Sequence, residues 1–307
     1  MAGWTTTRPR GPMRLDGGTG LARAEATARY AQAVRTTRAG WDACPPRVRM
    51  EALVAAVNTE LAHVAAPPAV TLLHELPPFT TPRRAWFLRG AWCVLFDPHA
   101  LGGGLGDEDL GRVASAAYHE ARHDEQTFRV ARKLAAEGAG ARRIELRLGI
   151  PAEIAAAAMA LPLEAGDRRA WDEAAAWQES IARSAADEPS QADTAADLLD
   201  EALDAYGRAR AAYRWAAEPA SPGRSGRAAL RTDYVRARER VRRLFALHDG
   251  LPFERDAWAT AALVQEQLGL APGSPADVLA GLDDDERSLR ADRVIKTGLA
   301  PASGASA

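Results

Sequence analysis

Residues 107–138 have the sequence DEDLGRVASAAYHEARHDEQTFRVARKLAAEG. Apolar side chains recur there every three or four positions, a spacing typical of a helix with one face in the protein core. The acidic start favours a helix N-terminus and Gly138 favours a helix end. We therefore predict one long, partly buried helix from about Asp107 to Glu137. Its apolar stripe consists of Leu110, Val113, Ala117, Phe128, Ala131 and Leu134.

The sequence before this helix indicates a small β-sheet. Segments 69–76 (AVTLLHEL) and 84–98 (RAWFLRGAWCVLFDP) are rich in β-branched and aromatic residues and are interrupted or bounded by proline and glycine. Most of the remaining sequence has helical spacing. We therefore predict a predominantly helical α+β fold, in which a small twisted sheet packs on the long helix and a helical part follows. The other expected helices lie at about 47–65, 166–187, 191–217, 227–247 and 253–269, with short ones between 142 and 166.

The two ends of the chain lack the pattern of a packed core. Residues 1–20 are rich in Pro, Gly, Thr and Arg, and residues 297–307 are small and polar, so we expect both to be disordered. We assign residues 21–296 to one domain. Within it, residues 21–138 carry the strands and the long helix, and residues 139–296 form the helical part.

Composition excludes several classes of protein. A net charge of −2 and 26% charged residues give no overall attraction for nucleic acid. Two cysteines are too few for a disulfide framework or a cysteine zinc site. The N-terminus has no apolar segment of signal-peptide length, and we find no membrane-spanning run. We expect synthesis in the cytoplasm, so export would need a route other than a cleaved signal.

The pentapeptide HEARH, residues 119–123, holds two of the six histidines of the chain. On a helix, His119 and His123 lie on one face with Cβ atoms about 6 Å apart, so both rings can bind one Zn²⁺. Glu120 lies about 100° further round the helix, where its carboxylate can reach a zinc-bound water without ligating the metal. The pattern therefore predicts two zinc ligands and one general base.

An aromatic strand followed by a helix with this motif resembles the core of the zincin metallopeptidases. The resemblance implies His119 and His123 as zinc ligands, Glu120 as catalytic base, and a third ligand outside the motif. The metzincin subclass has glycine and histidine where this chain has Gln126 and Arg129, so that subclass is excluded.

The third ligand is then expected on a later helix. Segment 251–264, LPFERDAWATAALV, is similar to the segment that supplies a glutamate ligand in several gluzincin groups. This resemblance implies Glu254 as the third ligand. Asp256 is an alternative ligand, or a second carboxylate that orients a ligand histidine. Glu179 is a further alternative ligand.

Two other histidines and one strand are candidates for binding the substrate. His248 precedes Glu254 by six residues, and His99 lies just before the long helix; either could stabilise an oxyanion. The strand at about 91–96 is the one we expect to pair with an extended substrate.

These patterns predict zinc-dependent hydrolysis of a peptide bond, in which a zinc-bound water is activated by Glu120 and the partner is a peptide or protein substrate. Two alternatives remain. One is a non-catalytic zincin-like domain with a structural or binding role. The other is a helical cargo or interaction protein, since residues 85–270 more loosely resemble H-E-x-x-H domains of bacterial polymorphic-toxin and contractile-injection cargo proteins. The sequence indicates no oligomeric state.

Overall fold

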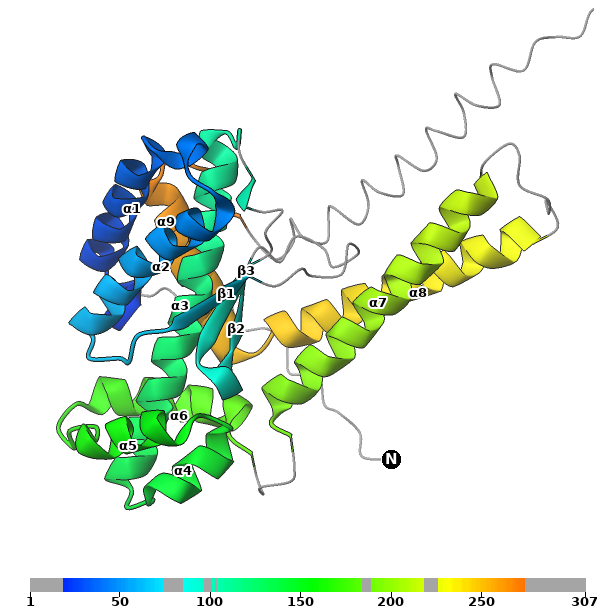
Figure 1. Cartoon of the computed structure of the whole chain (residues 1–307). Coiled ribbons are helices and arrows are strands. Elements are labelled where there is room, and N and C mark those ends of the chain that lie inside the picture. The colour runs from blue at the N-terminus through cyan, green and yellow to red at the C-terminus, as the bar shows by residue number, and fades with distance from the viewer. Residues whose placement is uncertain are drawn as a thin grey trace, which may run out of the picture.

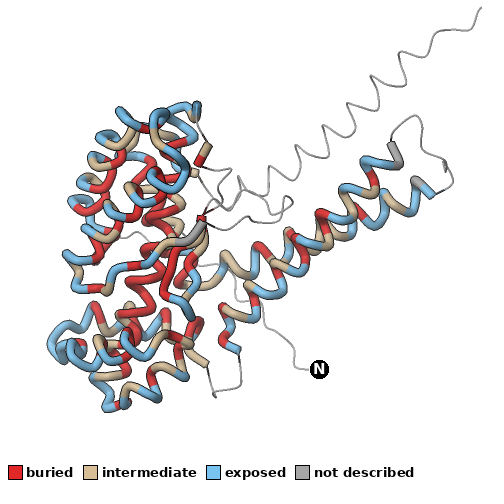
Figure 2. The backbone as a smooth tube through the Cα atoms, viewed as in Figure 1, coloured by how far each residue is buried: buried red, intermediate tan, exposed pale blue. Residues whose placement is uncertain are grey.

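The long helix predicted from the sequence is the centre of the structure. The computed structural model describes residues 19–73, 85–96, 101–102, 104–183, 189–217 and 226–273. Helix α3 (Asp107–Ala136) crosses the body of the protein and contacts helices on both sides as well as the sheet (Figure 1). Figure 2 shows that most of α3 is buried.

Both ends of α3 follow from local sequence. Its first turn is acidic, with Asp107, Glu108 and Asp109, which complements the positive end of the helix dipole. The chain leaves the helix at Gly138, whose φ of +87° is accessible to glycine at little cost. The predicted bounds are therefore confirmed to within one residue.

The sheet contains three strands among the described residues: β1 (Val70–Leu73), β2 (Ala85–Leu88) and β3 (Cys93–Phe96). Strand β3 is central, parallel to β1 and antiparallel to β2. The prediction that the strand at 91–96 pairs with a substrate is therefore wrong, because both edges of β3 already have partners. Strands β1 and β2 are the two edge strands of this described sheet, and β2 packs against α3.

Helices cover both ends of α3 and confirm the predominantly helical α+β class (Figure 1). At the end that carries its N-terminus lie α1, α2 and α9, and at the other end lie α4, α5 and α6. Prolines stand at the first turn of both α2 and α9, where a missing N–H costs nothing. The bounds are α1 (Ala24–Arg38), α2 (Pro46–His63), α4 (Ala141–Leu148), α5 (Ala152–Ala160), α6 (Arg168–Ile181) and α9 (Pro252–Gln267).

Two long antiparallel helices, α7 (Gln191–Ala217) and α8 (Arg227–Asp249), form a hairpin that projects from the body (Figure 1). The hairpin has its own apolar cluster, separate from the main core. Trp258 of α9 packs against this cluster at the base of the hairpin. The members of the cluster are Leu199, Ala202, Leu203, Tyr206, Tyr213, Tyr234, Val241 and Phe245.

Several predictions fall on other parts of the chain. Residues 1–18, 97–100 and 274–307 lie outside the described residues. They include all of the predicted tail 297–307 and all but two residues of the predicted N-terminal segment 1–20. Gly20, assigned to the disordered N-terminal segment, instead begins a buried 3-10 turn, Gly20–Ala22. The division into domains stays a prediction. None of the described helices combines the length and the apolar character needed to cross a membrane.

Candidate metal centre

Three side chains with metal-ligand atoms converge beside α3. His119 and His123, one turn apart, have their Nε2 atoms 3.0 Å from each other. Glu254, in the first turn of α9, reaches both rings: its Oε2 lies 3.4 Å from Nε2 of His119, and its Oε1 lies 3.4 Å from Nε2 of His123. All three residues are buried. We call these three residues the triad.

The dimensions of the triad fit one zinc ion. Zinc binds histidine nitrogen and carboxylate oxygen at roughly 2.0–2.2 Å in tetrahedral geometry, so two of its ligand atoms lie about 3.3–3.5 Å apart. The separations of 3.0, 3.4 and 3.4 Å in the triad are close to this value. Two histidines and one glutamate are also a known catalytic donor set. The side chains therefore fit zinc, and their role as ligands stays a prediction.

The triad is a buried cluster of opposite charges. Burial is the largest single influence and lowers the pKa of His123, but Glu254, together with Glu120 and Gln126, raises that pKa to about 9. Burial raises the pKa of Glu254, but His123 and His248 outweigh it and hold the pKa well below its usual value. The proton on His123 thus supplies positive charge that balances the negative charge of Glu254, as a bound metal cation would.

Glu120 lies beside the triad without joining it. Its Oε2 accepts a hydrogen bond of 2.8 Å from the backbone N–H of Phe87 on β2. The contact holds the carboxylate between α3 and the edge of the sheet, in the wall of the same cleft as the triad. A carboxylate fixed at that place suits the predicted role of a general base.

The other predicted candidates differ in position. His248, near the end of α8, places its Nε2 3.2 Å from Oε1 of Glu254 and lines the same cleft. Glu179 is exposed on α6 and is not among the residues that converge on the two histidines. His99 lies outside the described residues. Of these three, only His248 is brought to the site within the part of the chain that the structure describes.

Asp256 reaches a histidine of the triad through a residue that the sequence pattern did not select. Its Oδ2 accepts hydrogen bonds from Nε of Arg122 and from Nε2 of Gln126, each at 2.7 Å. Oε1 of Gln126 in turn lies 2.9 Å from Nδ1 of His123. Gln126 follows His123 by three positions, which places both on one helix face and was the available signal.

Asp249 is a second residue that the sequence did not indicate. Burial raises its pKa to about 6, and the negative charge of Glu254 contributes to the increase. Its Oδ1 is buried and has no hydrogen-bond partner among the described residues. An acid at a helix end is ordinary in sequence, so only the fold reveals that Asp249 lies close to the triad.

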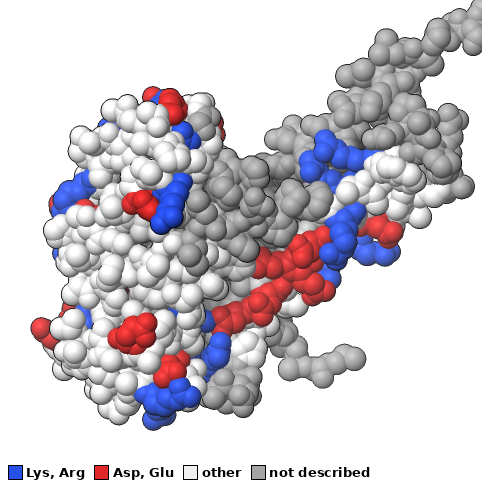
Figure 3. Space-filling model, in the orientation of Figure 1, with Lys and Arg blue, Asp and Glu red and all other residues white. Residues whose placement is uncertain are grey.

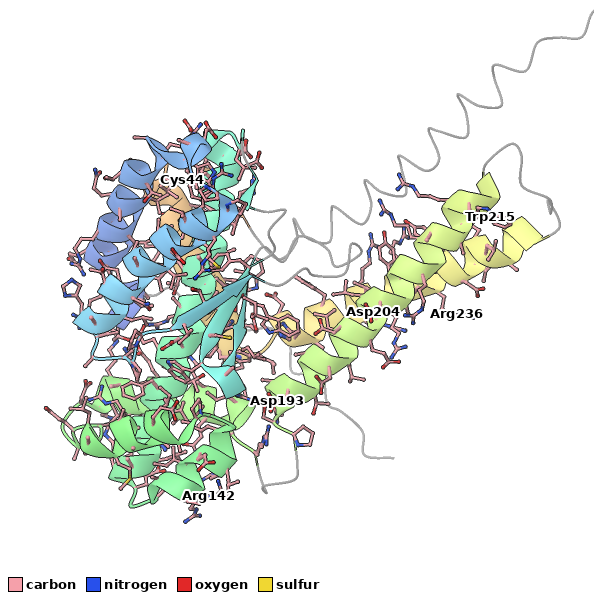
Figure 4. The ribbon with its side chains drawn as sticks, viewed as in Figure 1. Cys44, Arg142, Asp193, Asp204, Trp215 and Arg236 are labelled. Carbon is pink, nitrogen blue, oxygen red and sulfur yellow. The ribbon has the colours of Figure 1, made fainter. Side chains whose placement is uncertain are left out.

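A cleft of about 640 Å³ opens beside the triad. It is lined by β2, by α3 and by the base of the α7–α8 hairpin, and most of its wall is apolar, with Leu88, Leu203 and Phe245 among the lining residues. Asp193, labelled in Figure 4 at the start of α7, also lines it. Asp193 forms an ion pair with Arg89, which ties the end of β2 to the hairpin.

The chain matches none of the protein families, curated proteins or solved structures with which it was compared. Its function therefore has to be inferred from the arrangement of its own side chains. That arrangement has three parts: a buried donor triad, a carboxylate held at a sheet edge, and an apolar cleft that meets both.

Proposed function

We propose that this chain is a zinc-dependent peptidase. The observation that carries the proposal is the convergence of His119, His123 and Glu254 within 4.8 Å, with Glu120 beside them at the edge of β2. Structural zinc sites are closed by four protein ligands. Among the described residues three donors converge, and a cleft meets them. An open site of this kind is typical of catalytic zinc.

The chain supplies acid–base groups on either side of the triad. Zinc held by such a donor set lowers the pKa of water to about 7 and polarises a carbonyl oxygen. Glu120, held by the N–H of Phe87, accepts the proton of the attacking water and passes it to the leaving amine. His248, on the α8 side of the cleft, donates a hydrogen bond to the oxyanion as it forms.

An extended peptide is the substrate class that suits the cleft. Strand β2 is an edge strand, antiparallel to β3 on one side and next to α3 and the cleft on the other. A peptide can pair with such an edge through backbone groups of β2 other than the N–H of Phe87, which holds Glu120, and this pairing brings its carbonyl groups across the triad. Its side chains then enter the mostly apolar cleft.

Metal content is the first test. Protein purified without chelator should contain about one zinc per chain, as three converging donors require. The His119→Ala/His123→Ala double variant should contain none, because it loses two of those donors. Elemental analysis of both proteins after gel filtration measures this. Wild-type protein without bound metal would contradict the proposal.

Replacement of Glu120 separates a peptidase from a structural zinc site. Glu120→Gln should keep its zinc and lose peptide hydrolysis by about 10²–10⁴-fold, the usual contribution of a general base. Cleavage of a mixed peptide library, followed by mass spectrometry, measures the activity. Glu179→Gln, a substitution of an exposed glutamate on α6, is the matched control and should change neither property. Equal activity of Glu120→Gln and wild type would exclude the mechanism.

A further inference from the structure

Gln126 is a buried side chain with three hydrogen-bonding contacts around the triad. Its Oε1 lies 2.9 Å from Nδ1 of His123. Its Nε2 donates to the backbone carbonyl of Phe253 at 2.9 Å and to Oδ2 of Asp256 at 2.7 Å. Phe253 and Asp256 flank Glu254 on α9, so one amide connects the two helices that carry the triad.

These contacts permit one orientation of the amide. Both acceptors on α9 face its NH₂ group, so the amide oxygen must face His123. A flipped amide would place that oxygen against two other acceptors. The oxygen cannot donate, so Nδ1 of His123 must carry the hydrogen. In the neutral ring, Nε2 then carries no hydrogen. Nε2, which faces Glu254, is therefore the nitrogen available to a metal.

Asp256 is itself held in place. Arg122 donates to it through Nε at 2.7 Å and through Nη2 at 3.3 Å. Nη1 of Arg122 donates at 3.0 Å to the carbonyl of Thr19, and the guanidinium also pairs with Glu125. Arg122, Glu125 and Asp256 are all at least 96% buried. The position of Gln126 therefore depends on a network with little freedom to move.

The second histidine of the triad has no such support. Nδ1 of His119 is buried and has no hydrogen-bond partner among the described residues. An aromatic ring, that of Trp258, packs against His119 with 5.0 Å between ring centroids. Outside the triad itself, the ring of His119 is thus held by packing and the ring of His123 by a hydrogen bond. A loss of Gln126 therefore affects one identifiable ligand.

We propose that Gln126 is a positioning residue that orients His123 and fixes the tautomer with hydrogen on Nδ1, so that Nε2 is presented as a ligand. The inference rests on the proposed metal site. Outer hydrogen-bond partners of ligand histidines commonly raise metal affinity by about 10–100-fold. In this chain the partner is a neutral amide, and the carboxylate of Asp256 acts one step further out.

The zinc affinity of Gln126→Met, a variant of similar size without hydrogen-bonding groups, tests the proposal. Competition with a chelator should show a loss of about 10–100-fold. Gln265→Met is the matched control, because Gln265 also joins α9 to α3, and its side chain forms hydrogen bonds to Ser115 and Gly273 and not to the triad. Its zinc affinity should stay within about threefold of wild type. Wild-type affinity in Gln126→Met would overturn the inference and leave the proposed function standing.

A further measurement distinguishes positioning from packing. In the zinc-loaded protein, the Nδ1–H of His123 should give a slowly exchanging proton resonance that is lost in Gln126→Met. A loss of zinc affinity in Gln126→Met with the resonance retained would show a packing role and overturn the inference. Wild-type protein that binds no zinc would overturn the proposed function together with the inference.

Discussion

His123 and Glu254 stabilise each other as ions inside the protein. Each is more than 90% buried, and an isolated charge at either position would be costly. Removal of one partner therefore leaves the other charge uncompensated, whereas zinc replaces the proton and keeps the balance. The metal-free protein should consequently show a pH-dependent stability that originates in the triad.

The sign of this dependence follows from the pKa of His123, which is about 9 in the folded protein. The ordinary value in an unfolded chain is about 6.5. Since the folded state binds this proton more tightly, the stabilisation is complete below about pH 6.5 and is lost as pH rises through about 9. Chelator-treated wild type should therefore lose free energy of unfolding between about pH 6.5 and 9, as measured by urea denaturation.

His123→Gln is the control for this prediction, because its side chain does not titrate. The variant should be less stable than wild type at low pH, and its free energy of unfolding should lack the decrease that wild type shows. Parallel curves for the two proteins over this range would contradict the assigned pKa. Zinc affinity should also rise with pH over the same range, because zinc must displace the proton of His123.

At the scale of helices and strands, local sequence signals predicted where α3 begins and ends, but they did not predict how the strands pair. The acidic turn at Asp107 lies at the start of α3, and Gly138 lies just after its end. Each signal is adjacent in sequence to the helix end that it determines, so the bounds of α3 were predictable. The order of the strands depends on hydrogen bonds between distant segments. Residues 93–96 have the composition of a strand, and nothing local indicates that β1 and β2 flank them.

The same difference between local sequence signals and contacts between distant segments applies to the candidate site. His119, Glu120 and His123 form a local pattern, and the segment around Glu254 carries a second one, so the sequence could select them. The bridge from His123 through Gln126 to Asp256 joins α3 to α9 across more than one hundred residues. The three-residue spacing of His123 and Gln126 indicates only the first half of this bridge, and the packing of the two helices creates the second half.

The turn that begins at Gly20 anchors the N-terminal segment on α3. Gly20 has a φ of +58°, and a Cβ atom there would lie 1.6 Å from Oε1 of Glu125. Glu125 cannot easily retreat, because it pairs with Arg122 and Arg129 and accepts a 2.9 Å hydrogen bond from the N–H of Leu21. Gly20→Ala should therefore combine backbone strain with displacement of a buried carboxylate.

Gly138→Ala is the matched control for this position. Gly138 also has a positive φ, +87°, but a Cβ atom there would have no neighbour within 4 Å. Its substitution should cost about 1–2 kcal/mol of backbone strain. Gly20→Ala should cost clearly more in urea denaturation, and the difference reports the clash with Glu125. Equal costs for the two variants would show that the N-terminal turn is not tightly packed on α3.

For the whole molecule, the main question is whether the body and the hairpin unfold together. The outer surface of the hairpin is charged: acidic side chains gather on the half of α7 near the body and arginines towards the far end (Figure 3). Trp215 marks that far end in Figure 4. Beyond its base, the hairpin therefore depends on its own small cluster, whereas most of α3 is buried in the main core.

Tyr234 is the central residue of that cluster, with its ring 5.5 Å from Tyr206 and 5.6 Å from Tyr213. Truncation of a large buried ring costs about 3–5 kcal/mol, which is comparable to the stability of so small a core. Tyr234→Ala should therefore accelerate amide hydrogen exchange in α7 and α8 and leave α3 protected, as measured by mass spectrometry. Tyr30→Ala, which removes a buried tyrosine of the main core, should instead accelerate exchange in α3 and leave α7 and α8 protected. Equal acceleration in α3 and the hairpin after Tyr234→Ala would show that the two unfold as one cooperative unit. Events at the far end of the hairpin would then reach the triad through His248 at its base.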